Sequence, residues 1–170
     1  MILNKSQISE YITKKNMITN YIDIDAQIQS NGFDLTVKGI SLYHGSGTID
    51  LDNTHRGMPE YIIIQNQGSH HLEFGAYLID FNEKLKIPND IVALGYSRSS
   101  LLRMGANIPS AVFDAGFEGY PQGMLIVNNK HGLDIHKNAR VLQLIFLDRE
   151  NDDSSYNGKY ALPLFEESQV

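Results

Sequence analysis

Two arginines and three serines lie within nine residues of this chain, in the stretch GYSRSSLLR at residues 95–103. Arginine offers a planar fork of donors to phosphate oxygens, and serine hydroxyls and backbone amides can approach an anion closely. A short helix over residues 100–104 would add the partial positive charge of its N-terminal amides at the same point. The stretch favours an anion-binding turn. The simpler alternative is an exposed basic turn without a ligand, because short basic clusters are common.

An aspartate and several glycines follow in residues 111–128. The apolar run AVF leads into Asp114, and the run MLIV closes the stretch after three glycines, Gly116, Gly119 and Gly123. This pattern predicts two strands joined by a turn, with Asp114 at the rim. A carboxylate beside a phosphate-binding turn is unfavourable unless it holds a metal or a water. Glycines also let a flat ligand reach the backbone, so the two stretches together predict a nucleotide site.

Four stretches stand out as motifs, NGFDL (31–35), RSSLLR (98–103), VFDAGFEG (112–119) and ARVLQLIF (139–146). In this order they resemble four motifs of one superfamily, which contains the dUTP pyrophosphatases and the dCTP deaminases. The opening MILNKSQISEYI and the stretch YNGKY (156–160) are similar to the deaminase branch. The resemblance spans most of the chain. It implies a single dUTPase-like domain over residues 1–170, with residues 151–170 as a C-terminal tail that can move.

The resemblance assigns a role to each residue that matches a motif. Asp114 would orient and deprotonate the attacking water, and Phe117 would lie against the deoxyribose, although core packing explains a phenylalanine there equally well. Arg98, Ser99, Ser100 and Gln143 would hold the phosphates. The full substrate-binding set is Arg98, Ser99, Ser100, Arg103, Phe117, Gly119, Gln143, Tyr156, Lys159 and Tyr160, with Asp34 in a supporting role. Magnesium (Mg2+) would be bound through the triphosphate and water, so no side chain is assigned as a metal ligand.

The residue at position 124 separates the two reactions of the superfamily. In the deaminase branch a glutamate that shuttles the proton stands ten residues after the hairpin aspartate, and here that residue is Met124. A thioether cannot carry a proton. The resemblance therefore implies a dUTP diphosphatase that forms dUMP and pyrophosphate. Two alternatives stay open: a dCTP deaminase or bifunctional enzyme with another proton carrier, and a non-catalytic nucleotide-binding regulatory protein. Asp114 counts against the second, because a pure binder gains nothing from an anion near phosphates.

The C-terminal stretch lacks the glycine-rich motif with which typical trimeric dUTP pyrophosphatases close over the substrate. SSYNGKY (154–160) is a candidate replacement, in which Lys159 meets the γ-phosphate and Tyr156 or Tyr160 covers the ligand. Such a lid would exclude water from the charged site. The alternative is a solvated acidic tail, because acidic residues flank the stretch on both sides.

The elements that position these residues read as mostly β. Residues 4–15 predict a helix capped by Asn4, with Gln7 three residues on and Ile8, Tyr11 and Ile12 on one face. Short apolar runs then recur between turn signals, which predicts an all-β distorted barrel or jelly roll behind one short N-terminal helix. The runs are residues 33–37, 61–65, 72–78, 91–94, 111–113, 124–127 and 141–147.

Bulk properties limit the partners. A chain of 170 residues with a net charge of −6 is large enough for one core and is too acidic for a general nucleic-acid or membrane binder. The absence of cysteine excludes disulfides, thiolate metal sites and cysteine nucleophiles. The pair His70 and His71 is a poor chelator, because neighbours on a strand point to opposite faces. We expect a cytoplasmic protein with a small-molecule nucleotide partner, no signal peptide and no membrane span. The resemblance adds a homotrimer whose sites are shared between subunits.

Overall fold

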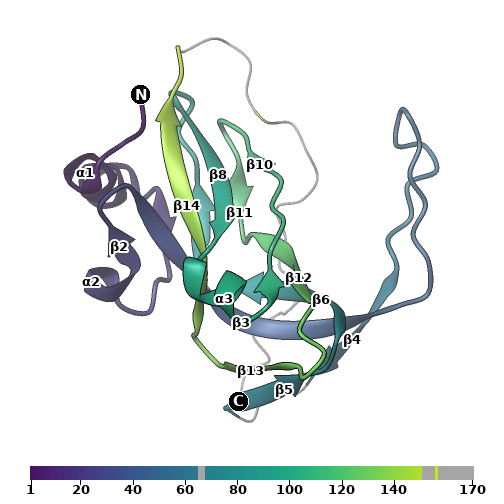
Figure 1. Cartoon of the computed structure of the whole chain (residues 1–170). Helices are drawn as coiled ribbons and strands as arrows, with labels where there is room; N and C mark the ends of the chain where they lie inside the picture. The colour runs from purple at the N-terminus through teal and green to yellow at the C-terminus, as the bar shows by residue number, and fades with distance from the viewer. Residues whose placement is uncertain (65–67, 151–155, 157–170) are drawn as a thin grey trace, which may run out of the picture.

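The computed structural model describes residues 1–64, 68–150 and Tyr156. Within this part the chain forms three helices and fourteen strands (Figure 1). The helices are α1 (Lys5–Lys15), α2 (Ile24–Gln27) and α3 (Ser99–Arg103). The strands are β1 (Ile18–Thr19), β2 (Ile28–Gln29), β3 (Gly32–His44), β4 (Glu60–Ile64), β5 (Ser69–Leu72), β6 (Gly75–Phe81), β7 (Lys84–Lys86), β8 (Ile91–Ser97), β9 (Ala106–Asn107), β10 (Val112–Phe113), β11 (Glu118–Gly119), β12 (Gln122–Val127), β13 (Leu133–His136) and β14 (Arg140–Asp148).

One nine-stranded antiparallel sheet forms the body of the described structure. Its main path runs β10-β8-β14-β3-β6-β12-β9, with β2 and β4 also paired to β3. Figure 1 shows this sheet curling, so that one face encloses the core. Phe33, Phe81 and Phe146 are fully buried there. The predicted all-β fold with a short N-terminal helix is confirmed.

The long strand β3 joins the two halves of the curled sheet. Its first residues pair with β14, and from Val37 onward it pairs with β6, with a register shift between Val37 and Gly39. From Ile40 onward it also pairs with β4. Beyond His44 the chain extends away from the body as an arm and returns at Glu60 (Figure 1). The bulge increases the twist of the strand and so allows one strand to serve both halves.

The N-terminal helix begins where the sequence predicts. The Asn4 side chain accepts from the Gln7 main-chain N–H at 3.1 Å, and the Gln7 side chain accepts from the Asn4 N–H at 3.0 Å. These two bonds form a capping box. Ile8 and Ile12 are buried against the sheet, as their spacing predicts, and the Leu3 N–H donates to Phe146 at 2.9 Å. The segment just before the helix is therefore joined to the end of β14.

Two strand predictions differ from the structure. The run at residues 72–78 is not one strand, because β5 ends at Leu72 and β6 begins at Gly75. The two strands predicted in residues 111–128 exist as β10 and β12, but within the described residues they do not pair with each other. β10 pairs with β8, whereas β12 pairs with β6 and β9. Among the described residues, no helix is long and apolar enough to cross a membrane.

Candidate active site

The serine- and arginine-rich turn lies at the end of β8. Ser97 closes the strand, and the five-residue helix α3 follows with Arg98 as its N-cap residue. Ser99, Ser100 and Arg103 are exposed on this helix. Their hydroxyl and guanidinium groups are available to an anion from solvent. Helix α3 agrees with the helix predicted for residues 100–104, displaced by one residue.

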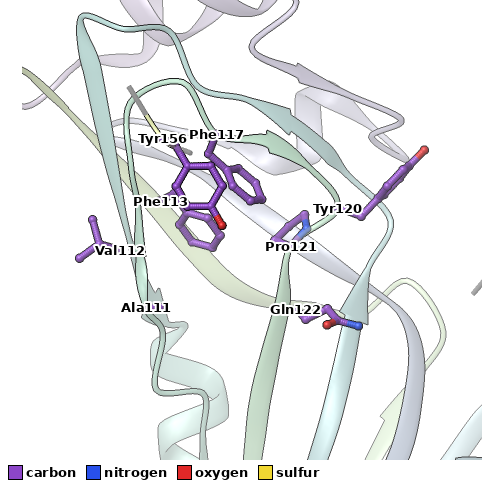
Figure 2. Close-up of a pocket in the computed structure, with 8 residues that line it drawn as sticks. All are labelled: Ala111, Val112, Phe113, Phe117, Tyr120, Pro121, Gln122 and Tyr156. Carbon is purple, nitrogen blue, oxygen red and sulfur yellow. The ribbon is translucent and has the colours of Figure 1, made fainter. Parts of the chain in front are cut away.

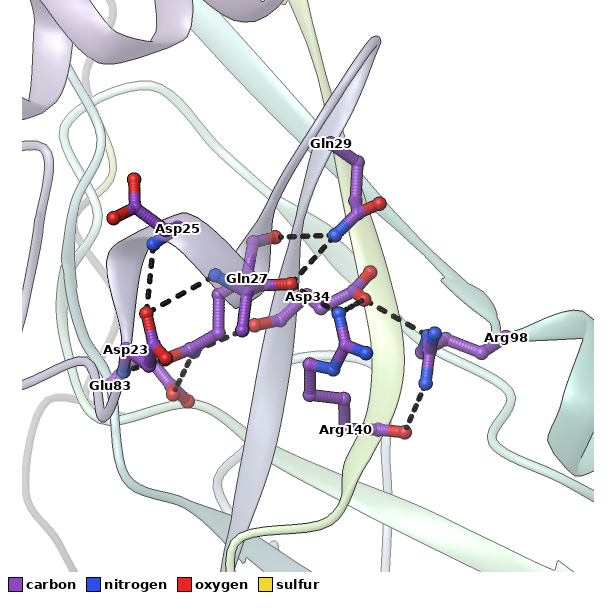
Figure 3. A network of polar contacts seen from close by, with 9 residues as sticks. Asp23, Asp25, Gln27, Gln29, Asp34, Glu83, Arg98 and Arg140 are labelled. Atoms are coloured by element: carbon purple, nitrogen blue, oxygen red, sulfur yellow. Dashed lines mark hydrogen bonds and ion pairs between the residues drawn. The ribbon is translucent and has the colours of Figure 1, made fainter.

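Arg98 does not extend into solvent. Its Nε lies 2.9 Å from Oδ2 of Asp34, and its Nη1 donates to the main-chain oxygen of Arg140 at 3.1 Å (Figure 3). Arg140 Nη1 lies 3.4 Å from the same Oδ2 and also donates to the main-chain oxygen of Ala26. Two guanidiniums therefore share one carboxyl oxygen, and Asp34 fixes the direction in which both are held.

Asp34 is 1% exposed. Burial raises the pKa of its carboxyl, and the charges of Arg98 and Arg140 oppose that shift. The other oxygen, Oδ1, has no hydrogen-bond partner among the described residues. Loss of either arginine would leave a buried charge with less compensation, which is costly in a folded protein. The supporting role expected for Asp34 therefore has a physical basis in this ion-pair cluster.

A second buried polar cluster holds β3 in place behind Asp34. Gln27 Nε2 donates to the main-chain oxygen of Asp34 at 2.9 Å and to Glu83 Oε1 at 2.7 Å. Glu83 also accepts from the Thr36 N–H at 3.0 Å and from the Thr36 hydroxyl at 2.5 Å. Burial raises the pKa of Glu83, and these donors oppose the shift. No local sequence pattern predicts this cluster, because its members come from three separated segments.

Gln143 lies on β14 directly opposite Asp34 on one side and Tyr96 of β8 on the other. Opposed residues of an antiparallel pair direct their side chains to the same face, so Gln143 shares a face with the arginine cluster. A Cβ at Gly32 would lie 3.0 Å from Gln143 Cγ and would also clash with the main-chain oxygen of Leu144. Glycine at position 32 thus allows β3 and β14 to pack closely beside Gln143.

The aspartate turn is built on residues 114–117. The Phe117 N–H donates to the Asp114 main-chain oxygen at 3.1 Å, and Gly116 has a φ of 83°. That left-handed conformation suits glycine at the third position of a type II turn. The Ile87 main chain holds the turn, accepting from the Gly116 N–H at 2.9 Å and donating to Phe117 at 2.8 Å. The Asp114 carboxylate is exposed, without a hydrogen bond or ion pair to any other described residue.

A pocket of about 210 Å³ lies beside this turn (Figure 2). Three aromatic rings form one end of it. Phe117 packs edge to face against Phe113, with centroids 5.8 Å apart, and against Tyr156, with centroids 5.5 Å apart. The other lining residues come from β10, from β12 and from the residues directly before them, namely Ala111, Val112, Tyr120, Pro121 and Gln122. The pocket therefore occupies the place where a paired hairpin was predicted.

Phe117 is both buried, at 7% exposure, and part of the pocket wall, so the two readings of this residue describe one position. Gly119 lies in β11, paired with Leu85 and next to the lining residue Tyr120. The Tyr156 N–H donates to Ala115 at 2.8 Å, which brings this tyrosine to the pocket. Lys159 and Tyr160 lie outside the described residues. Six lining residues were missed by sequence reasoning: Ala111, Val112, Phe113, Tyr120, Pro121 and Gln122.

The two halves of the predicted site lie apart within one chain. Phe113 pairs with Ala93 in the middle of β8, whereas Arg98 follows the end of that strand. Five residues of strand at ~3.3 Å each separate them, about 17 Å. The Arg98 turn and the Asp114 turn of one chain therefore lie well apart along β8.

The carboxylates suit an ion that arrives with its substrate. No cluster of three or more histidine, aspartate or glutamate side chains that could hold a metal occurs in the described part of the chain. Asp114 is an exposed carboxylate, and Asp34 Oδ1 is an acceptor without a partner among the described residues. Magnesium keeps much of its water and commonly uses one or two carboxylates together with substrate phosphates. The residues present therefore fit magnesium carried on a triphosphate.

Met124 lies on β12 opposite Leu78 and is 38% exposed. Its side chain points to the same face as that of Gln122, two residues earlier. On this face Gln122 lies opposite Asp80, and the thioether of Met124 lies opposite the apolar Leu78.

Known proteins and families that are similar to this chain carry names of two kinds, dCTP deaminase and deoxyuridine 5′-triphosphate nucleotidohydrolase. A family model described as dCTP deaminase-like matches residues 2–148. A probable deoxyuridine 5′-triphosphate nucleotidohydrolase of Archaeoglobus fulgidus is 36% identical over 159 residues, covering 94% of this chain and 95% of that protein. The deoxyuridine 5′-triphosphate nucleotidohydrolase of Methanocaldococcus jannaschii is 38% identical over 151 residues, covering 87% and 94%.

A solved structure shares the fold. The 2′-deoxycytidine 5′-triphosphate deaminase of Agrobacterium tumefaciens superposes with a TM-score of 0.64 at 21% identity, over 85% of this chain and 46% of that chain. The chain thus spans less than half the length of that deaminase, whereas it spans nearly the whole length of the two nucleotidohydrolases.

Proposed function

This chain belongs to the dCTP deaminase-like family, and from that premise we propose that it is a dUTP diphosphatase, which hydrolyses dUTP to dUMP and pyrophosphate. Its relatives at 36–38% identity over most of the chain are named deoxyuridine triphosphate nucleotidohydrolases. The observation that carries the proposal is the exposed carboxylate of Asp114, which stands between the pocket-lining residues Phe113 and Phe117.

Asp114 acts as the general base in the proposed mechanism. Its carboxylate accepts a proton from a water, and the water oxygen forms a bond to the α-phosphorus. The bond from the α-phosphorus to the oxygen that bridges it to the β-phosphorus breaks, and that oxygen leaves with pyrophosphate. A positioned base of this kind contributes about 10²–10⁴-fold to rate. Its exposure, without a hydrogen bond or ion pair in the described structure, leaves Asp114 free to bind that water.

The pocket receives the nucleoside. Phe117 lies against the deoxyribose, where its ring leaves no space for a 2′-hydroxyl, and Tyr156 covers the same end of the pocket. The base lies between the segments of β10 and β12, whose facing edges are not paired with each other in the described structure. Main-chain N–H and C=O groups on those edges can then bond to the base.

The serine and arginine turn holds the triphosphate. Ser99, Ser100 and Arg103 are exposed donors on α3, and Gln143 shares a face with Arg98. Asp34 keeps Arg98 and Arg140 oriented through Oδ2. A magnesium ion carried by the triphosphate would neutralise charge on the leaving pyrophosphate, and Asp114 is the exposed carboxylate that could help to hold it.

The site is shared between subunits of a homotrimer. The Arg98 turn of one chain meets the Asp114 turn of its neighbour, because the two are about 17 Å apart along β8 of a single chain. Exposed apolar side chains flank both turns. Tyr96, Leu102 and Met104 lie beside the first, and Val112 lies beside the second, each more than half exposed. Apolar surface of this kind commonly marks a contact with another chain.

Deamination of dCTP is the second candidate, favoured by the name of the matching family model. Met124 argues against it, because the position opposite Leu78 carries no group that can transfer a proton. A non-catalytic nucleotide binder is the third candidate, and Asp114 argues against it, since a carboxylate near phosphates weakens binding without a reaction to serve.

One incubation separates the three. Purified protein is mixed with magnesium and either dUTP or dCTP, the nucleotide products are separated, and pyrophosphate and ammonia are assayed. We expect dUMP and pyrophosphate from dUTP, with no ammonia from dCTP. Ammonia from dCTP would establish a deaminase, and the absence of product from both nucleotides would establish a binder.

A further inference from the structure

Gln122 is the polar side chain of the pocket that comes from the strand β12. It is exposed and lines the pocket with Tyr120 and Pro121 (Figure 2). On the sheet it lies directly opposite Asp80 of β6. Its Nε2 donates to Asp80 Oδ1 at 2.7 Å. One hydrogen of the amide is therefore used inside the protein, while Oε1 and the second hydrogen of Nε2 stay available to a ligand.

The carboxyl group of Asp80, which accepts this hydrogen bond, is buried. It is 5% exposed, and its Oδ2 has no hydrogen-bond partner among the described residues. Burial raises its pKa, and the Gln122 hydrogen bond and the charge of Lys38 oppose that shift. A carboxylate only accepts hydrogen bonds, so the nitrogen side of the amide has to face it. Asp80 thus fixes the order in which Gln122 presents its oxygen and its remaining N–H.

The neighbouring residues hold this segment still. Tyr120 accepts a hydrogen bond from Asn20 at 2.7 Å, and the Lys38 ammonium lies 5.4 Å from the centre of the Tyr120 ring. The opposite face of β12 is closed, because a Cβ at Gly123 would lie 3.0 Å from Ile108 Cγ2. A base at this strand meets the face that carries Gln122, and that amide is already oriented before the base arrives.

Uracil and cytosine differ in the order of the hydrogen-bond donor and acceptor on the Watson–Crick edge, and a side-chain amide presents one group of each kind. Uracil offers a donor at N3 next to an acceptor at O4, whereas cytosine offers an acceptor at N3 next to a donor at N4. An amide can pair with either edge, but only in opposite orientations, and a locked amide suits one of the two. Thymine shares the N3 and O4 groups of uracil.

We propose that Gln122 pairs with the Watson–Crick edge of the base, and that Asp80 is the positioning residue that makes the site accept uracil and reject cytosine. The inference rests on the proposed hydrolysis of dUTP and adds the residue pair that selects the base. The Oε1 of Gln122 accepts from N3–H of uracil, and its second Nε2–H donates to O4. With cytosine at the same place, donor faces donor and acceptor faces acceptor.

The test compares kcat/KM for dUTP, dCTP and dTTP in the wild type, in Asp80→Asn and in Gln122→Leu. Asparagine can donate as well as accept, so it releases the amide to turn, and leucine removes the amide altogether. We expect the ratio of dUTP to dCTP to fall by about tenfold or more in both variants, the range of a good bidentate pair with a base. The ratio of dUTP to dTTP should stay unchanged, because both bases present the same edge. Asp134→Asn, an exposed aspartate paired with His71, is the control and should alter neither ratio.

Each result decides a separate point. A merely structural loss would lower all three kcat/KM values together, and unchanged ratios in both variants would overturn the inference while leaving dUTP hydrolysis intact. Should Asp80→Asn fail to fold, Gln122→Leu at its exposed position gives the same decision alone. A wild-type protein that forms no dUMP from dUTP would refute the proposed function and this inference with it.

Discussion

The distance between the Arg98 turn and the Asp114 turn predicts that two inactive variants restore activity when they share one oligomer. The first variant, Asp114→Asn, removes the proposed base. The second, Ser99→Asp, puts a carboxylate at the first residue of α3, where the triphosphate would bind. Ser99 is exposed, and an acidic residue near a helix N-terminus is well tolerated, so this variant should fold. Each variant alone should be almost inactive.

The size of the recovery follows from the ring. In a closed trimer that contains both variants, one contact of the three joins an intact Asp114 to an intact Ser99, whether the ring holds two copies of the first variant or of the second. Mixed trimers should therefore show about one third of the wild-type rate, because a cyclic trimer has one heterologous contact per subunit. The assay is co-expression with two different affinity tags, purification on both, and measurement of pyrophosphate released from dUTP.

A control substitution separates this effect from the introduced charge. Ser46→Asp places the same charge on an exposed serine of the arm that follows β3, and it should leave activity unchanged. If the doubly purified trimers are as inactive as each variant alone, the base and the phosphate turn serve the same chain, and the separation along β8 has been misread. A fully active monomer in light scattering would refute the shared site by another route.

Four further outcomes are expected. Asp114→Asn should bind dUTP as the wild type does but turn it over at least about a hundredfold more slowly, in titration and pyrophosphate assays, and normal turnover would remove the assigned base. Met124→Glu should release no ammonia from dCTP, because deamination also needs a placed water and oxyanion contacts, whereas measurable ammonia would show that this machinery is present. Burial and then the contact with Asp90 raise the pKa of Tyr11 to about 12, above its unfolded value of 10.0, so the neutral phenol is favoured in the fold. The stability that this neutral phenol contributes is therefore complete below pH 10 and is lost as the pH rises through about 12. In thermal unfolding curves, Tyr11→Phe should lack this loss of stability between pH 10 and pH 12. Gly32→Ala should lower the free energy of unfolding in urea by roughly 1–3 kcal/mol through overpacking between β3 and β14, and an unchanged midpoint would show that the strands can move apart.

Local signals in the sequence were sufficient for the features that depend on neighbouring residues. Asn4 and Gln7 predicted the start of α1 because a capping box is formed within one turn of chain. The alternation of apolar runs and turns predicted the longer strands, but not short ones such as β1, β7 and β11, and it merged the end of β5 with β6. The burial of Ile8 and Ile12 followed from their spacing. The Asp114 turn was also predictable, since Gly116 supplies the left-handed backbone that it needs.

Contacts between distant segments were not predictable in this way. Arg98 and Asp34 are 64 residues apart, and nothing near either one indicates that the arginine is held by a buried carboxylate. A turn rich in glycine suggests a paired hairpin, but it carries no information on the partner of each strand. In the structure β10 pairs with β8, and β12 pairs with β6. Glu83 was missed for the same reason, because its three donors come from Gln27 and Thr36.

The unpaired gap between β10 and β12 also bears on the thermodynamics of the empty protein. At strand edges that face a cavity, the unpaired main-chain N–H and C=O groups form hydrogen bonds with water. A base bound there would replace that water as the hydrogen-bond partner. In the proposed complex the nucleotide would occupy these edges as an added strand would. Its binding free energy becomes part of the resistance of the domain to unfolding, by about 2.7 kcal/mol at a ligand concentration about one hundred times Kd. Melting temperature consequently reports nucleotide concentration, and amide hydrogens along both edges should exchange more slowly once dUMP is bound.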